Sequence, residues 1–169
     1  MPTTTHRDSD TSTPPECVGP MAISPALARA LRSLADAATV DDVVPLSVCA
    51  TELLRRLSRP GARTWAHVIC GPREAVAPLS TECWDPGLSF RAALSRYARR
   101  RMSTVRVDLT ILVSPDHDRL YVERMTDSAD LPTAQHCADS FLHLLASLTA
   151  EPDAPLAAHT LPEEGGAGD

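Results

Sequence analysis

The chain has 169 residues, which is enough for one domain with a hydrophobic core but short for two. Its formal net charge of -6 at pH 7 argues against a general nucleic-acid-binding domain, because such domains usually present a net basic surface. The five cysteines have no C-x-x-C spacing, and their odd number and scattered positions argue against a disulfide framework and a zinc site.

Polar segments flank the expected domain. Residues 1–21 are rich in threonine, serine, proline and aspartate, so they cannot bury enough apolar surface to offset the entropy lost on ordering. We expect a disordered tail there, a second tail over residues 162–169, and one domain over residues 22–161. The amino terminus lacks an apolar signal-peptide core and no run of about 18 apolar residues occurs, which favours a cytoplasmic protein without membrane contact.

Two amphipathic helices and a strand are expected first. Ser24 followed by Pro25 is typical of an N-cap with proline at the first helical position. The apolar stripe of this helix is Ile23, Leu27, Leu31, Leu34 and Ala38. A second helix is marked by Leu46, Cys49, Leu53 and Leu57. It ends before Pro60 and Gly61, and the following residues 64–70, TWAHVIC, are rich in strand-forming side chains, which predicts a strand.

The second half of the chain predicts a loop, two more helices and a hairpin. Residues 74–88 have no clear periodicity and are expected to form a loop. A third helix is marked by Phe90, Ala93, Leu94 and Tyr97. Alternation over residues 105–113 and the run 120–125, joined by turn residues 114–118, predict a β-hairpin. A last helix over residues 132–149 completes an order typical of an α+β fold, with helices packed on a small mixed sheet.

Several of these segments resemble, in the same order, parts of the condensation domains of nonribosomal peptide synthetases. Residues 108–113, DLTILV, and residues 151–156, EPDAPL, are similar to the DLTL-like closing strand of that family and to the DPDAPL-like phrase after its last helix. Residues 89–99, SFRAALSRYAR, resemble the family's SFRELLARVR-like helix, and residues 23–73 resemble the stretch before it. Together they resemble the carboxyl-terminal lobe of a two-lobed, chloramphenicol-acetyltransferase-like fold.

The sequence departs from that family in ways that bear on activity. The catalytic signature HHxxxDG lies in the amino-terminal half of the family's domain, and no two histidines are adjacent in this chain. Residues 74–88 are shorter than the family's region with a GFFVNTLPLR-like strand, and residues 100–106 replace a long segment. These pieces help to form the family's substrate tunnel. The resemblance therefore implies a truncated half-domain in which condensation catalysis is not expected.

His67 and Cys83 are the candidate catalytic residues. His67 lies in the predicted strand beside Trp65, and its imidazole suits the work of a general base; a hydrogen-bonded core histidine is the alternative interpretation. Cys83, beside Trp84 and Asp85, would need a histidine or a positive group next to it to act as a nucleophile, and none is adjacent in sequence.

The remaining histidines are interpreted as structural or solvated. The tail-like segments hold His6 and His159, and the flanks of the apolar stripe on the last helix hold His136 and His143. His117 falls in the hairpin turn, where a solvated side chain is expected. Its neighbours Asp116 and Asp118 point in different directions from it in a turn, so we expect no metal there. No P-loop, GxGxxG or GxSxG motif occurs, and we expect no cofactor.

An arginine group is the candidate partner-binding surface. Its members are Arg96, Arg99, Arg100, Arg101 and Arg106. These guanidinium groups could dock the acidic surface of a carrier protein or a synthetase, or contact phosphate. The alternative is a solvated helix end, where positive charge is favourable against the helix dipole.

These observations lead to two functional hypotheses. The first is a non-catalytic, condensation-like accessory or docking protein in nonribosomal peptide or related natural-product biosynthesis. It would bind a synthetase, a carrier protein or a second copy of itself, because a lobe without its mate must cover the apolar surface that the mate would bury. The alternative is a small enzyme that performs cyclisation or acyl transfer on a carrier-tethered or free intermediate, with His67 or Cys83 taking part.

Overall fold

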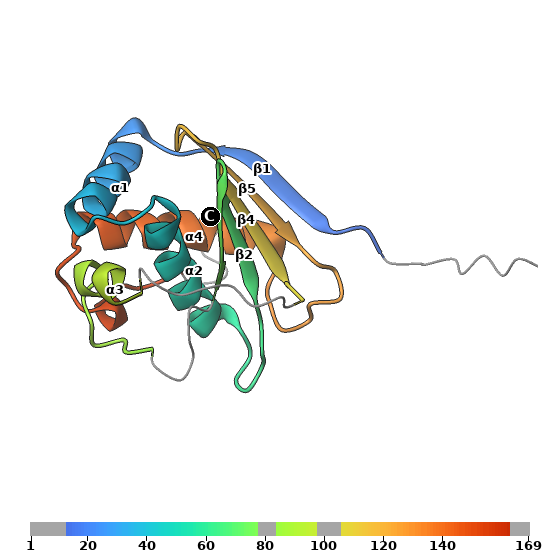
Figure 1. The fold of residues 1–169 in the computed structure, drawn as a ribbon. Helices are drawn as coiled ribbons and strands as arrows, with labels where there is room; N and C mark the ends of the chain where they lie inside the picture. Colours follow the sequence, from blue (N-terminus) through green and yellow to red (C-terminus); the bar gives the residue numbers. More distant parts are fainter. Residues whose placement is uncertain (1–12, 78–83, 98–105, 163–169) are drawn as a thin grey trace, which may run out of the picture.

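The computed structural model describes residues 13–77, 84–97 and 106–162. Its elements in chain order are β1 (Glu16–Ala22), α1 (Pro25–Ala38), α2 (Val43–Leu57), β2 (Ala66–Cys70), β3 (Arg73–Ala77), α3 (Phe90–Tyr97), β4 (Leu109–Val113), β5 (Arg119–Arg124), α4 (Ala134–Ala150) and a short 3-10 turn (Leu156–Ala158) (Figure 1). Helices and strands of one chain pack together in this arrangement, and the predicted α+β class is confirmed.

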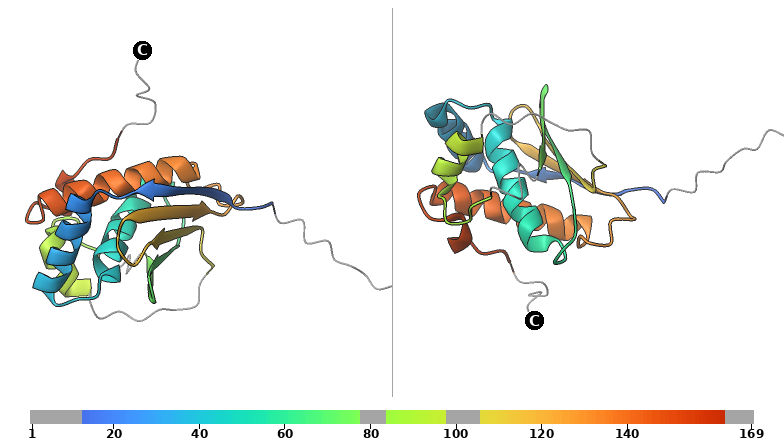
Figure 2. Two further views of the ribbon diagram at one scale, coloured as in Figure 1. Left: turned by 90° about the horizontal axis from the view of Figure 1, so that it is seen from above. Right: turned by 60° about the horizontal axis from the view of Figure 1, so that its bottom comes forward.

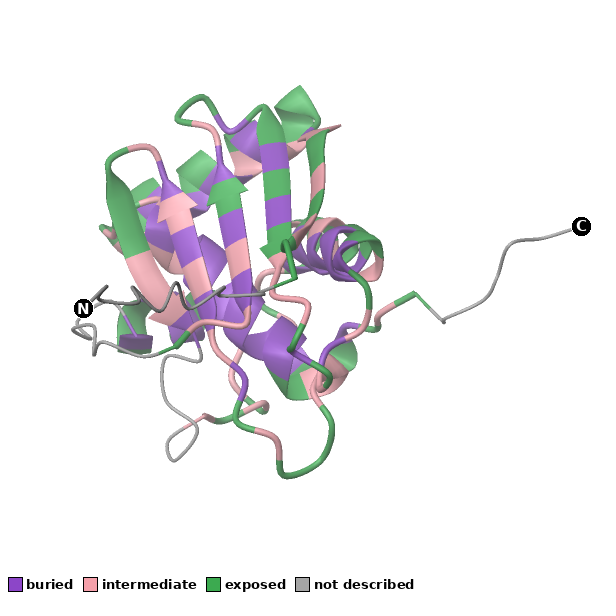
Figure 3. Cartoon of the chain, turned by 90° about the vertical axis from the view of Figure 1, so that its right-hand side faces the viewer, coloured by how far each residue is buried: buried purple, intermediate pink, exposed green. Residues whose placement is uncertain are grey.

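The five strands form one mixed sheet in the order β1-β5-β4-β2-β3. β2 and β4 run parallel, and the other neighbouring pairs are antiparallel. The helices lie on one side of this sheet, as the two views of Figure 2 show, and the opposite side faces the viewer in Figure 3 without a helix over it. Because side chains alternate along a strand, one face of the sheet is buried against the helices and the other is open.

The strand register aligns apolar side chains in rows across the sheet. The buried row is Val68, Ile111 and Val122, and the next row, on the open side, is Ile69, Leu112 and Tyr121. We call the second set the open-face row. Leu112 and Tyr121 are each 37% exposed, and they are the exposed large hydrophobic residues of the described part of the chain. The sheet thus presents an apolar strip over three adjacent strands.

α2 is the central helix of the molecule. Among residues 43–54 every side chain except that of Val44 is buried, and the helix packs against β2, β3, α3 and α4. A helix enclosed in this way needs apolar residues nearly all round. The largest fully buried side chains near it include Leu46, Leu53, Phe90, Leu94, Phe141 and Leu144. Burial of each such side chain contributes about 1.5–3 kcal/mol.

The predicted N-cap at Ser24 is confirmed, and the last helix, predicted from residue 132, begins at Ala134 behind a cap that was not predicted. Ser24 Oγ accepts a hydrogen bond from the backbone N–H of Leu27 at 3.2 Å, and Pro25 opens α1. Thr133 Oγ1 accepts from the backbone N–H of His136 at 3.2 Å and caps α4. In both places the sequence supplies an oxygen for one of the backbone donors that a helix start leaves unpaired.

The predicted amino-terminal tail over residues 1–21 is wrong for residues 16–21. Those residues belong to β1, which pairs antiparallel with β5 and forms an edge of the sheet. Glu16 also approaches Arg124 at 3.4 Å. The polar, proline-containing composition hid this strand, because an edge strand tolerates proline and owes its order to its partner strand. Residues 1–12 of the predicted tail and residues 163–169 at the other end lie outside the described residues.

Two further sequence predictions need correction. The loop expected over residues 74–88 contains most of β3. The residues of this strand pair with those of β2, from Arg73 opposite Cys70 to Ala77 opposite Ala66. The strand expected over residues 105–113 begins only at Leu109. Asp108 instead turns its carboxylate onto neighbouring segments: Oδ2 accepts from the Trp65 backbone N–H at 2.9 Å and Oδ1 from the Ser128 hydroxyl at 2.7 Å.

Gly19 lies at the irregularity between Val18 and Met21 in the pairing of β1 with β5. Its φ is 125°, and a Cβ there would lie 2.7 Å from the Leu120 carbonyl oxygen. We expect Gly19→Ala to lower the free energy of unfolding by about 2–4 kcal/mol, measured by urea denaturation, because conformational strain and a backbone clash act together. Gly61→Ala is the matched control: its φ is 83° but nothing lies within 4 Å of the added Cβ, so only about 1–2 kcal/mol is expected. Equal losses of unfolding free energy in the two variants would contradict the close approach of Gly19 to β5.

Candidate functional site

A pocket of about 820 Å³ lies at the carboxyl end of α2. Its walls come from the last turns of that helix, from the loop of residues 58–65 and from residues 84 and 86. The side chains that give it character are Arg55, Arg56, Arg59, Arg63, Trp65 and Trp84, and its described lining contains no aspartate or glutamate. We call it the Arg–Trp pocket. Sequence reasoning missed it, although four arginines within residues 55–63 were a usable signal.

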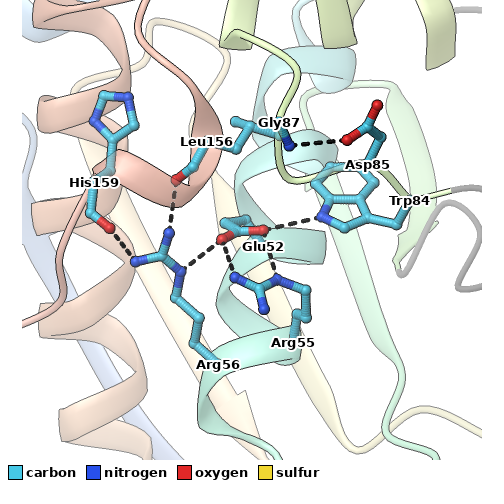
Figure 4. A network of polar contacts seen from close by, with 8 residues as sticks. All are labelled: Glu52, Arg55, Arg56, Trp84, Asp85, Gly87, Leu156 and His159. Carbon is cyan, nitrogen blue, oxygen red and sulfur yellow. Dashed lines mark hydrogen bonds and ion pairs between the residues drawn. The ribbon is translucent and has the colours of Figure 1, made fainter.

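A buried carboxylate organises the arginines of this pocket. Glu52 is fully buried, and its Oε1 accepts from Arg55 Nη2 at 2.7 Å and from Arg56 Nε at 2.6 Å (Figure 4). Its Oε2 accepts from Arg55 Nε at 3.0 Å and from Trp84 Nε1 at 3.0 Å. Burial by itself would raise the pKa of Glu52, but the hydrogen bonds from Arg55, Arg56 and Trp84 outweigh it and hold the pKa below its usual value. The carboxylate is therefore ionised and fixed.

Arg56 extends the same network to the end of the chain. Its Nη2 donates to the Leu156 carbonyl at 2.7 Å and its Nη1 to the His159 carbonyl (Figure 4). His159, expected in a polar tail, is in fact 4% exposed, and its Nδ1 lies 2.7 Å from Ser147 Oγ. The reason is that Arg56 and Ser147 hold this segment against the helices. The local sequence around His159 carries no sign of such long-range bonds.

The two tryptophans of the pocket are held by different means. Trp65 immediately precedes β2, and its backbone N–H and carbonyl both bond to Asp108, with Asp108 N 2.8 Å from the Trp65 carbonyl oxygen. Trp84 donates to Glu52 and stacks on Tyr97 with ring centroids 4.9 Å apart. The Trp84 indole is therefore fixed before any ligand arrives, whereas the bonds to Asp108 hold the backbone of Trp65.

The candidate base His67 does not lie in a pocket. It is on the open face of β2, its side chain is 26% exposed, and its Nε2 is 3.0 Å from Glu74 Oε2 on β3. It lines neither the Arg–Trp pocket nor a smaller adjoining pocket of about 420 Å³. Cys83, the other catalytic candidate, lies outside the described residues. The structure therefore does not bring the two candidates together into a described site.

The predicted arginine group is only partly within the described structure. Arg96 is exposed on α3, with its guanidinium carbon 6.0 Å from the centre of the Tyr97 ring. Arg106 is exposed and pairs with Asp127. The other three members, Arg99, Arg100 and Arg101, fall outside the described residues. Arg106 lines the smaller pocket with several acidic residues, so its charge is locally balanced.

A second cluster, also missed by sequence reasoning, lies where β2 and the β4–β5 turn meet. His117, expected to be solvated, is 1% exposed, because the parallel pairing of β2 and β4 brings the turn beside Cys70. Its Nε2 is 3.4 Å from Cys70 Sγ and 3.5 Å from Asp42 Oδ2, while its Nδ1 has no partner in the described part of the chain. Burial lowers the pKa of His117 and raises that of Cys70 to about 11.

The described residues contain neither a metal-binding cluster nor a membrane-spanning helix. No group of three or more histidine, cysteine, aspartate or glutamate side chains that could hold a metal ion occurs among residues 13–77, 84–97 and 106–162. Within those ranges no helix combines the length and the apolar character that a membrane crossing requires.

The sequence matches no protein-family model and no curated protein, whereas solved structures match over most of its length. The first condensation domain of the CDA synthetase is 15% identical with a TM-score of 0.59, covering 94% of this chain and 50% of that chain. The condensation domain from the monacolin K polyketide synthase MokA is 12% identical with a TM-score of 0.61, and the match covers 91% of this chain and 52% of that chain. The first condensation domain of the calcium-dependent antibiotic synthetase, in complex with substrate analogue 3a, is 17% identical with a TM-score of 0.60, covering 90% and 48%.

These matches identify the fold. The arrangement of helices on one side of a mixed sheet is of the chloramphenicol-acetyltransferase-like class. More narrowly, it is the fold of half a condensation domain, because the chain spans about half the length of the three solved chains. The resemblance predicted from the sequence is confirmed at the level of fold. The assignment to the carboxyl-terminal half continues to rest on the sequence segments.

The Glu52 network generates a prediction about stability. Glu52→Gln should lower the free energy of unfolding by about 3 kcal/mol, because the guanidinium of Arg56 loses its carboxylate in a largely buried place. In the wild type, the folded-state pKa of Glu52 is lowered from 4.5, so its stabilisation is complete above that value and is lost as the pH falls through the lower folded pKa. Urea denaturation at several pH values between about 3 and 7 should show a shallower acid loss for Glu52→Gln than for the wild type. Parallel pH profiles would contradict this account of Glu52.

Proposed function

We propose that this chain is a non-catalytic, condensation-like accessory or docking protein in nonribosomal peptide or related biosynthesis. The observation that carries the proposal is the uncovered face of the sheet. In a fold that matches half of each condensation domain, the open-face row has Leu112 and Tyr121 exposed and Ile69 half-buried on three adjacent strands. An apolar strip of this kind, bordered by polar side chains, is typical of a surface that meets another protein.

The partner that fits this face is a synthetase polypeptide. The open-face row is bordered by the carboxylates of Glu74, which faces Ile69 across β2 and β3, and Glu123, on the same face of β5. Arg119, also on that face of β5, pairs with Asp118. A docking partner should therefore offer an apolar centre with basic groups around it. An acidic carrier-protein surface would be repelled by these carboxylates and by the net charge of -6.

A non-catalytic role agrees with the position of the predicted base. Condensation chemistry in the resembled family depends on HHxxxDG, which this sequence does not contain. His67, the residue we considered as a substitute, is bonded to Glu74 on the open sheet face and lies outside the described cavities. A base must reach the proton that it removes, and no described cavity beside this half-buried imidazole would hold a substrate.

One observation favours the alternative, a small acyl-transfer enzyme. His117 Nε2 lies 3.4 Å from Cys70 Sγ and 3.5 Å from Asp42 Oδ2, so a thiol, an imidazole and a carboxylate meet there, as a nucleophile, a base and an acid would. Their geometry is unsuitable in one respect: a single nitrogen, Nε2 of His117, makes both contacts, whereas an activated thiol needs the carboxylate on the other nitrogen. The raised pKa of Cys70 also keeps its thiol protonated near neutral pH.

Thiol labelling separates these two functions. With the pKa of Cys70 raised to about 11 and its side chain 6% exposed, iodoacetamide at pH 7.5 should alkylate the exposed Cys17 and leave Cys70 unlabelled in the folded protein. Peptide mass spectrometry after minutes and hours gives the two rates. Unfolded protein, in which both thiols should react alike, is the control. Faster alkylation of Cys70 than of Cys17 would support the enzyme and contradict a purely structural thiol.

Docking is tested by affinity purification from the native host followed by mass spectrometry. The wild type should bring down a peptide synthetase or polyketide synthase polypeptide. Leu112→Glu should reduce its recovery at least tenfold, since a charge is introduced into the centre of the strip. Ala92→Glu, an exposed change on α3 in the helical layer, introduces the same charge and should leave recovery unchanged. Thermal unfolding verifies that both variants are folded. Equal recovery with all three proteins, or recovery of the chain alone, would contradict docking through this face.

A further inference from the structure

We propose that the Arg–Trp pocket is a binding site for a small organic anion, a carboxylate or phosphate joined to a flat apolar group. This proposal goes beyond docking and does not depend on it. The volume of about 820 Å³ is within the range of pockets for small organic ligands. The pocket also contrasts with the rest of the chain, because it has four arginines and no acidic residue in its described lining, although the whole chain carries a charge of -6.

Carboxylates of the described chain do not balance all of the positive charge in the pocket. Glu52 balances one positive charge, and its two arginine partners, Arg55 and Arg56, sit in the last turn of α2, where they also offset the negative end of the helix. Arg59 and Arg63 are exposed, and neither side chain has a hydrogen-bond or ion-pair partner within the described ranges. Arg63 also lines the smaller, partly acidic pocket, so Arg59 is the arginine farther from negative charge. Their guanidinium groups thus remain available to an anion.

The type of anion follows from the shape of these groups. A guanidinium presents a planar fork of N–H donors that matches two oxygens of a carboxylate or phosphate. Arg55 supports such a contact, because Glu52 holds its guanidinium at two points while 44% of its side chain stays exposed. A ligand can therefore meet a preorganised cation without first ordering a flexible side chain.

The two tryptophans determine the rest of the ligand. Trp65 and Trp84 are both only partly buried, so each indole presents apolar surface to the pocket. Indole rings attract flat apolar groups through stacking and dispersion. The chain has only these two tryptophans, and both line the pocket. A bound ligand should consequently alter the intrinsic tryptophan fluorescence directly.

The pocket is separate from the proposed docking face. None of the three residues of the open-face row lines it. The pocket is formed instead at the end of α2, where the loop of residues 58–65 turns back toward the sheet. Ligand binding and docking can therefore fail independently, and the Leu112→Glu variant should bind the ligand as the wild type does.

The experiment titrates the full chain with four probes and follows tryptophan fluorescence and heat of binding. The probes are 3-phenylpropionate, phenyl phosphate, the neutral analogue 3-phenylpropionamide and inorganic phosphate. We expect both aromatic anions to change the fluorescence with saturation, and the amide to bind at least tenfold more weakly because it has no charge for the arginines. Inorganic phosphate, without an apolar group, should also bind at least tenfold more weakly than phenyl phosphate.

Matched arginine variants locate the site. Arg63→Gln and Arg59→Gln, at exposed positions without partners in the described structure, should each weaken 3-phenylpropionate binding about tenfold and leave the thermal unfolding temperature unchanged. Arg29→Gln removes the same charge from the exposed side of α1, away from the pocket, and should leave binding unchanged. The proposal is overturned if neither aromatic anion binds, if the amide binds as tightly as the acid, or if Arg29→Gln weakens binding as much as Arg63→Gln.

Discussion

The hydrogen bonds of the buried Glu52 carboxylate hold together the carboxyl end of α2, the segment around Trp84 and the carboxyl-terminal turn. Its oxygens accept from Arg55, Arg56 and Trp84, and Arg56 in turn bonds to the carbonyls of Leu156 and His159. One side chain of the central helix therefore fixes the segment around Trp84 and the carboxyl-terminal turn together. A carboxylate can be buried here only because its hydrogen bonds to two guanidinium groups and an indole replace those that it would make with water.

This arrangement divides the molecule into parts with different roles. The helical side of the sheet is used for stability, since α2 is enclosed by strands and other helices and contributes core residues such as Leu46 and Leu53. On the open side, no helix among the described residues covers the sheet, and its exposed apolar residues Leu112 and Tyr121 are where we propose that a synthetase docks. The Arg–Trp pocket lies at the carboxyl end of α2, and its Arg59 and Arg63 have no side-chain partner in the described part of the chain. Neither surface requires the catalytic histidines of a complete condensation domain.

Local signals in the sequence predicted the helices and the hairpin. The features that were missed depend on contacts between segments distant in sequence. Ser24 with Pro25 was sufficient for the start of α1, because capping is a local interaction. β1 was not predicted, since its order comes from β5, which lies about a hundred residues later. The burial of His117 and His159 likewise depends on segments distant in sequence. Glu52 could have been noticed, because Arg55 and Arg56 follow it at helical spacing on an otherwise apolar helix.

The central claim is that the open sheet face meets a synthetase while the helical layer stays in solvent. Hydroxyl-radical footprinting of the chain, alone and in its purified complex, measures this directly, because it reports the exposure of individual side chains. The account predicts that oxidation of Tyr121 and Leu112 falls several-fold on complex formation, while the exposed His143 on α4 is oxidised as before. Unchanged oxidation of Tyr121 together with protection of His143 would contradict it and would place the interface on the helices.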